Sequence, residues 1–291
     1  MIVTLDDLLV QTVALPDANG LRWKLTDLVQ WYSSPAIRSD ISDAPQSDTA
    51  FDTDRSWRGS KRMTLEGIIT ARSTEDAVAY GWQRVAGIAP RGERMLLTVT
   101  DPTGTYTMRV RPNGIPQVAP FTDRRARFQI PLEAADGRKY GPWIADLEAQ
   151  PAGGGAGDGL IFPLFGPEGV GTLDFGAFSP SGLIEITNTG TAESWPIFRV
   201  QGRIDEPGFQ IVSDASILQF SGAVPLGQVL TLSPYSGGRA TLGGVDLTGE
   251  SLTRSEWMPI GPGETRQFAF NPLGAFDGNA RLFADFREAW W

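Results

Sequence analysis

The sequence predicts a mainly β protein of two domains, and three observations support this prediction. Glycine and proline are frequent, at 34 and 21 of 291 residues, and they follow no period, which is typical of many turns between short segments. Apolar runs of four to eight residues recur between these turns, as expected for strands. A chain of 291 residues is longer than one hydrophobic core usually serves, so two domains are expected.

The strongest early strand signal lies in WRGSKRMTLEGIIT, which begins at Trp57. Met63 and Leu65 alternate there with Thr64 and Glu66, the period of a strand with one buried face. Before it, short strands are expected up to about residue 35, followed by an exposed acidic loop over residues 39–54.

A single helix is predicted after this strand. Ser73 or Thr74 can cap its N-terminus, and Glu75 and Asp76 favour the first turn. The pattern places Val78, Trp82 and Val85 on one face, and the helix is expected to end near Gly87 and Pro90.

A β-hairpin and a further strand complete the first domain. Met95–Thr100 and Thr105–Arg111 flank a turn of sequence DPTG, which has proline and glycine at favourable turn positions. The strand Arg127–Glu133 follows, with Phe128, Ile130 and Leu132 on one face.

The segment QPAGGGAGDG, which begins at Gln150, is predicted to be a linker because it cannot bury enough apolar surface to fold alone. We therefore expect domains over residues 1–149 and 164–291, joined by a linker over 150–163. Charge supports a division: residues 1–150 carry 18 basic and 19 acidic residues, whereas 151–291 carry 7 and 15. Eight strand-like runs indicate a β-sandwich in the second domain; they cover residues 183–187, 196–202, 209–213, 217–220, 229–232, 240–244, 266–270 and 281–286.

The composition narrows the possible functions. The chain contains no cysteine and no histidine, which excludes disulfides, Cys or His zinc sites and the usual nucleophile–base pairs. No enzyme activity, catalytic residue, metal or cofactor is expected, although a glycosidase working with two carboxylates stays an alternative. Clustered cations for nucleic acid are lacking, and there is no apolar run long enough for a membrane span. Asp6 and Asp7 interrupt the N-terminal apolar stretch, so Sec export is not expected.

Two short motifs suggest ligand sites, but neither matches the full sequence pattern of the site that it suggests. The linker contains a partial glycine motif for phosphate binding, but no predicted strand precedes it and no helix clearly follows. The acidic loop could hold calcium, yet Arg55 stands where an EF-hand requires a glycine-containing turn. A solvated loop is the simpler interpretation; its five aspartates are Asp40, Asp43, Asp48, Asp52 and Asp54.

Nine tryptophans raise the possibility of carbohydrate binding, since exposed indoles can stack on sugars. The candidates in the second half are Trp195, Trp257, Trp290 and Trp291. The alternative is that Trp195 and Trp257 pack against strands and that the C-terminal pair fastens the last strand to the sheet or to a neighbour.

The order of these segments resembles the distal tail proteins of long, flexible-tailed bacteriophages (siphophages). WRGSKRMTLEGII is similar to the first strand of that family, and FQIPLEAADGRKYG is similar to a strand followed by its Asp-Pro-Arg-Lys-Tyr-Gly turn, with Gly137 in place of proline. In the second half the matching positions are Asn188, Gly190, Pro196, Gly202, Trp257, Pro262 and Gly263. The resemblance covers roughly residues 57–290.

The resemblance implies a structural virion protein. It implies an N-terminal β-barrel-like ring domain with one helix and a C-terminal β-sandwich that is galectin-like or similar to a carbohydrate-binding module. Six copies would form a ring at the distal end of the tail, after assembly in the host cytoplasm. Its implied partners are the tail tube protein, the tail-tip hub protein (similar to a tail-associated lysin) and the tape measure protein, with DNA only in transit. A carbohydrate-binding module for host recognition is the alternative function.

Three groups of residues become candidate sites under this hypothesis. Arg138, Lys139 and Tyr140 would contact a neighbouring copy in the ring. The five aspartates of the acidic loop would line the channel and repel phosphate. Trp290 and Trp291 would contact a glycan or a partner protein.

Overall fold

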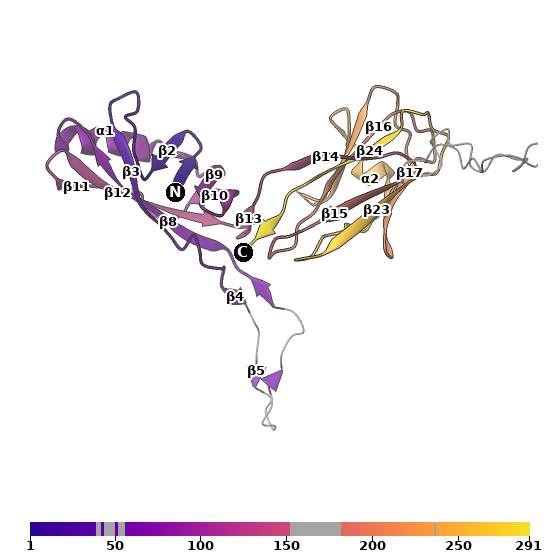
Figure 1. The fold of residues 1–291 in the computed structure, drawn as a ribbon, viewed down its shortest axis with the longest axis horizontal. Coiled ribbons are helices and arrows are strands. Elements are labelled where there is room, and N and C mark those ends of the chain that lie inside the picture. The colour runs from indigo at the N-terminus through magenta and orange to yellow at the C-terminus, as the bar shows by residue number, and fades with distance from the viewer. Residues whose placement is uncertain (39–41, 44–49, 52–55, 152–181, 236) are drawn as a thin grey trace, which may run out of the picture. The chain divides into compact units, whose positions relative to one another are not determined.

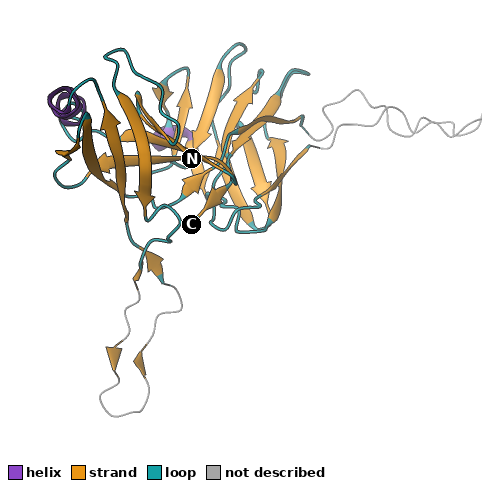
Figure 2. Ribbon diagram, turned by 60° about the vertical axis from the view of Figure 1, so that its left-hand side comes forward, coloured by secondary structure: helices purple, strands orange, loops and turns teal. Residues whose placement is uncertain are grey.

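The chain forms two compact units that are both rich in strands (Figures 1 and 2). A computed structural model describes residues 1–38, 42–43, 50–51, 56–151, 182–235 and 237–291. The first unit is Met1–Pro142 together with Trp290–Trp291, and the second is Trp143–Ala289. The chain thus leaves the first unit after Pro142 and returns to it at Trp290. The predicted class, a barrel with one helix followed by a sandwich, is confirmed.

Seven strands of the first unit close into a barrel. The closing contact is a pairing of β10 with β12 through Arg111–Glu133 and Pro112–Leu132. Around the barrel the order is β12 (Arg125–Ala134), β8 (Lys61–Thr70), β3 (Arg22–Val29), β2 (Leu8–Gln11), β1 (Ile2–Leu5), β9 (Met95–Asp101) and β10 (Gly104–Pro112). Closure removes the free edges of these strands.

Shorter strands extend the barrel sheet. β11 (Gln117–Thr122) pairs with β12, and β13 (Lys139–Tyr140) lies between β10 and β25 (Ala289–Trp290). Two small antiparallel pairs lie between β3 and β8 in the sequence; they are β4 (Ile37–Arg38) with β7 (Trp57–Arg58) and β5 (Ser42–Asp43) with β6 (Ala50–Phe51). The second of these pairs falls within the segment that the sequence predicted as a loop.

The predicted strand faces point into the barrel. Met63 and Leu65 of β8 are buried, as are Phe128, Ile130 and Leu132 of β12. β8 and β12 pair along ten residues each, from Thr70–Arg125 to Lys61–Ala134. Gly67 in β8 makes this packing possible, because a Cβ there would lie 2.5 Å from the Phe128 ring. Phe128 therefore fills the space that a glycine leaves open.

Helix α1 (Thr74–Ala86) begins and ends where the sequence predicts. The Ser73 hydroxyl accepts a hydrogen bond from the amide of Asp76 at 3.0 Å, and the amide of Gly87 donates to the carbonyl of Gln83. Its buried face differs from the prediction, however. It consists of Ala77, Gly81 and Val85, while Trp82 is 59% exposed.

The physical reason for this error is the small size of Gly81. A Cβ on Gly81 would lie 2.5 Å from the Cδ1 atom of Ile69, so the helix backbone packs close to the barrel along its glycine and alanine. This approach turns Trp82 toward solvent.

The second unit is a sandwich of two antiparallel sheets. One contains β14 (Ile144–Ala149), β24 (Arg281–Phe286), β16 (Ile197–Gln201), β19 (Val229–Ser233), β20 (Arg239–Leu242) and β21 (Val245–Asp246). The other contains β15 (Leu183–Thr187), β23 (Thr265–Pro272), β17 (Phe209–Ser213), β18 (Ser216–Phe220) and β22 (Leu252–Ser255), and a short helix, α2 (Thr248–Ser251), precedes β22. Phe198 and Phe268 join the two sheets, with ring centroids 5.2 Å apart.

All eight runs predicted for this half form strands. β14, which the sequence prediction placed in the first domain, pairs with β24 of the second unit. The division between units therefore lies seven residues before the predicted end of the first domain at residue 149. The predicted linker over 150–163 lies outside the described residues except for Gln150 and Pro151.

Candidate functional site

The turn that the resemblance singled out, Asp136–Tyr140, is held together by its own side chains. The Tyr140 hydroxyl donates a hydrogen bond to the Asp136 carboxylate at 2.6 Å, and the Arg138 amide donates to the same carboxylate at 3.2 Å. Tyr140 is only 5% exposed, and burial together with the charge of Asp136 raises the pKa of its phenol. The carboxylate thus serves as the internal anchor of the turn.

Lys139 points into the first unit, where it meets a second buried lysine. Both ammonium groups lie against the indole of Trp31, with Lys139 Nζ 5.0 Å and Lys61 Nζ 5.5 Å from its ring. Lys61 donates a hydrogen bond to the Trp31 carbonyl at 2.8 Å and is 2% exposed. Burial, with a smaller contribution from the like charge of Lys139, lowers the pKa of Lys61 to about 8.

Asp101 is the carboxylate of this cluster. It accepts hydrogen bonds from the Trp31 indole at 3.2 Å, from the Tyr32 hydroxyl at 3.1 Å, and from the amide and hydroxyl of Thr103 at 2.8 and 2.5 Å. Burial alone would raise the pKa of Asp101, but these donors outweigh it and the pKa is lowered. We call Trp31, Tyr32, Lys61, Asp101 and Lys139 the lysine–indole cluster.

The C-terminal tryptophans pack against the same unit. The Trp290 ring meets the edge of Tyr106, with centroids 5.1 Å apart and planes at 79°. The guanidinium groups of Arg58 and Arg138 lie over the ring of Trp291, at 4.6 and 5.4 Å from its centroid. These contacts match one alternative from the sequence, in which the pair fastens the last strand to the sheet.

The predicted sites are therefore placed as follows. Arg138, Lys139 and Tyr140 have partners within their own unit, and a role for them in a ring contact stays a prediction. Glycan contact by Trp290 or Trp291 also stays a prediction. The acidic loop is outside the described residues at Asp40, Asp48, Asp52 and Asp54, and only the backbone is described at Asp43, in β5.

Sequence reasoning missed most of the lysine–indole cluster. It treated Asp101 only as a turn residue and did not single out Trp31, Tyr32 or Lys61. One signal was available: lysine occurs only at positions 24, 61 and 139, whereas arginine occurs 22 times. Lysine is a compact charge that can be buried and can lose its proton, so its rare positions were candidates for a buried site.

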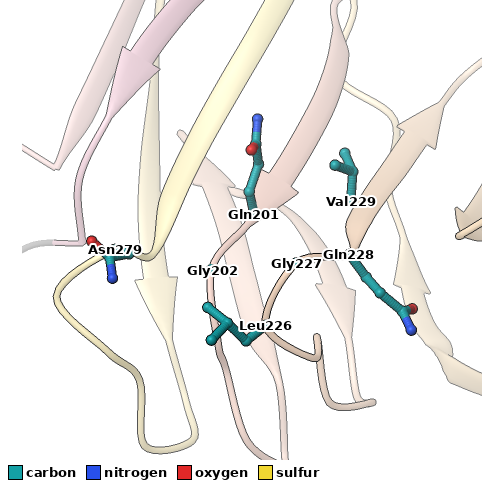
Figure 3. Close-up of a pocket in the computed structure, with 7 residues that line it drawn as sticks. All are labelled: Gln201, Gly202, Leu226, Gly227, Gln228, Val229 and Asn279. Carbon is teal, nitrogen blue, oxygen red and sulfur yellow. The ribbon is translucent and has the colours of Figure 1, made fainter.

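The second unit has a small surface pocket of about 260 Å³ at the ends of β16 and β19 (Figure 3). Three carboxamides and two aliphatic side chains line it, together with glycine backbone; the residues are Gln201, Gly202, Leu226, Gly227, Gln228, Val229 and Asn279. In Figure 3 the amides of Gln201 and Gln228 point in different directions, so the carboxamides do not converge on one ligand. None of the lining residues is aromatic, and the pocket thus lacks a ring on which a sugar could stack.

Within the described ranges, acidic side chains do not gather in groups of three that could hold a metal ion. Neither described helix has the length and hydropathy needed to cross a bilayer.

Comparison with solved structures gives a match over the whole chain. The crystal structure of the Dit (gp 19.1) protein of SPP1, described as a paradigm of the hub adsorption apparatus in phages that infect Gram-positive hosts, superposes with a TM-score of 0.68. The match covers 100% of this chain and 99% of the SPP1 chain at 12% sequence identity. This chain has the Dit fold.

The Dit fold confirms, at the level of structure, the resemblance seen in the sequence. Two structures of the phage P2 baseplate in its activated conformation, with Ca and with Sr, also match at 9% identity and TM-scores of 0.48. They cover 90% and 98% of this chain, and 89% and 97% of theirs. No family model matches the sequence, and no curated protein matches it either.

Proposed function

We propose that the chain is a structural protein of a phage tail tip, a ring-shaped adaptor between the tail tube and the tail-tip hub. The observation that carries the proposal is the match to SPP1 Dit across both units, with 100% and 99% of the two chains covered. A match of one unit alone would indicate only a common β architecture, because such folds serve many functions. Here both units occur together in one chain.

In this proposal six copies form a closed ring through the first unit. The barrel is a rigid element, since β12 closes it on β10, and a rigid element suits a subunit that must repeat around an axis. The ring contacts the tail tube protein on one side and the hub protein on the other. The tape measure protein and then the DNA pass through its channel. The chain has no catalytic role and lies at the distal end of the tail in the virion.

Measurement of the particle formed by the purified chain tests the proposal. Multi-angle light scattering is expected to give six times the mass of one chain, and negative-stain electron microscopy is expected to show six-fold rings. A strict monomer at every concentration, and in the presence of the tail tube protein, would contradict the adaptor function.

Carbohydrate binding by the second unit is the alternative function. The exposed aromatic side chains of its described part are Trp143 and Phe276, at 46% and 38%. The Arg287 guanidinium already lies 4.7 Å from the Trp143 ring centroid. Binding of host cell-wall glycan by the full chain, lost in Trp143→Ala, would favour this alternative.

A further inference from the structure

Two of the three lysines in the chain are buried side by side in the lysine–indole cluster. Lys61 is 2% exposed and Lys139 is 9% exposed. The charge of Lys139 lowers the pKa of Lys61, whereas the charge of Asp101 opposes the lowering of the pKa of Lys139 by burial. Two buried cations therefore face one buried carboxylate.

That carboxylate is already occupied by other donors. Asp101 accepts four hydrogen bonds, from Trp31, Tyr32 and Thr103, and none comes from a lysine. Lys61 has the Trp31 carbonyl as its acceptor. Among the described residues, Lys139 Nζ has no hydrogen-bond acceptor; its neighbours are the faces of Trp31 and Tyr32, at 5.0 and 5.9 Å.

The Lys139 ammonium keeps some contact with solvent, but it has lost part of its hydration without gaining a hydrogen-bond acceptor, and such a loss is costly. Groups that destabilise the fold in this way are often found at functional sites. Arginine would fill the same place with a fixed fork of donors, whereas lysine presents a single point charge to one small anion. Tyr32, which is 66% exposed and hydrogen-bonded to Asp101, is the member of the cluster that meets solvent.

We propose that Lys139, with Lys61 behind it and Tyr32 at its rim, binds a carboxylate supplied by an acidic side chain of a second copy of the chain. One negative charge balances the single excess positive charge of the cluster. A second copy is well able to supply it, because the chain has 34 acidic and 25 basic residues. This inference rests on the proposed ring and assigns one of its contacts.

The test is Lys139→Met, which keeps the length of the side chain and removes its charge. Lys24→Met is the matched control, because Lys24 is the third lysine and is exposed on β3. We expect Lys139→Met to melt at or above the temperature of the unaltered chain, since it removes a buried charge that has no hydrogen-bond acceptor, and to lose assembly in sedimentation velocity. Lys24→Met is expected to assemble normally.

Acetate provides a second measurement that does not need a variant. At constant ionic strength, acetate in place of chloride is expected to raise the melting temperature of the unaltered chain and to weaken its assembly. If Lys139→Met assembles normally but loses the stabilisation by acetate, the site binds a free carboxylate and the second copy is not its source.

A lower melting temperature for Lys139→Met, with assembly and the acetate response unchanged, would overturn the site and leave the proposed adaptor intact. If the unaltered chain never assembles, the adaptor proposal fails, and the acetate response still decides whether the carboxylate site exists.

Discussion

Gly137 offers a sharp test of how the first unit packs, because the family that the sequence resembles has proline at this position. A Cβ built on Gly137 would lie 2.3 Å from Cγ and 3.3 Å from Cβ of Pro35, and 3.3 Å from Cβ of the buried Lys61. Ordinary contacts between such atoms are longer than about 3.5 Å. Both neighbours are stiff or buried, so Gly137→Ala requires the turn or the segment at Pro35 to move by about 1 Å.

The expected magnitude follows from two opposing terms. Overpacking of this kind costs about 1–3 kcal/mol, and removing a glycine from the unfolded chain offsets about 0.4–1 kcal/mol. We therefore expect Gly137→Ala to lower the free energy of unfolding by about 1–2 kcal/mol. For a unit of this size the melting temperature falls by roughly 3–8 °C.

Differential scanning calorimetry measures this change, and Gly59→Ala is the control. A Cβ on Gly59 would meet only the Ala36 carbonyl, at 3.6 Å, so that variant is expected to melt at or slightly above the unaltered chain. Combining Gly137→Ala with Pro35→Ala, which removes the clashing Cγ atom, is expected to cost less than the sum of the single changes. If Gly137→Ala alone melts as high as the unaltered chain, the close approach of Pro35 is refuted.

Three further predictions concern a cap, a titration and an ion pair. Ser73→Ala is expected to lower the free energy of unfolding by about 1 kcal/mol in a denaturant titration, and Ser73→Asp, which restores a cap, to recover most of it. Lys61 has a folded pKa of about 8 against an ordinary value of 10.5, so between pH 8 and 10.5 the unfolded chain holds the extra proton and this group makes stability rise with pH. The expected rise in the free energy of unfolding is about 1–3 kcal/mol, and Lys61→Met is expected to lack it. Parallel pH profiles of the free energy of unfolding for Lys61→Met and the unaltered chain would contradict this. Arg199 donates to both oxygens of Asp285, at 2.8 and 2.9 Å, and to Asp146 at 2.6 Å; Arg199→Lys is expected to cost about 1–2 kcal/mol, and equal denaturation midpoints would contradict the role of this fork.

Local patterns predicted much of the fold. The alternation in β8 and β12 gave the correct inward faces, and Ser73 and Gly87 gave the correct helix ends, because neighbours in sequence determine these features. The predicted helix face was right at Val85 and wrong at Trp82, because Gly81 permits a close approach that hydrophobicity alone does not reveal. The strand pairing that closes the barrel joins Arg111 to Glu133 and has no local signature at all.

The candidate site was predicted less well than the fold. The turn at Asp136 was singled out from the sequence, and the contact with a neighbouring copy that was expected for its charged residues stays a prediction. In β13 two consecutive residues, Lys139 and Tyr140, are both buried, so the alternation of a two-sided strand does not hold there. The partners of Lys139 in the cluster, Trp31, Tyr32 and Asp101, come from the end of β9 and from the loop after β3, and the sequence does not show that they meet.

The return of Trp290 and Trp291 to the first unit has a consequence for biosynthesis. The contact between Tyr106 and Trp290 cannot form until the 147 residues of the second unit, Trp143–Ala289, have been translated. Contacts so distant along the chain form late, because a long loop must close before they are made. A ribosome that stalls within the second unit would release a barrel with the Tyr106 surface uncovered. The contacts of Trp290 and Trp291 with the first unit can therefore form only after the whole second unit has been synthesised.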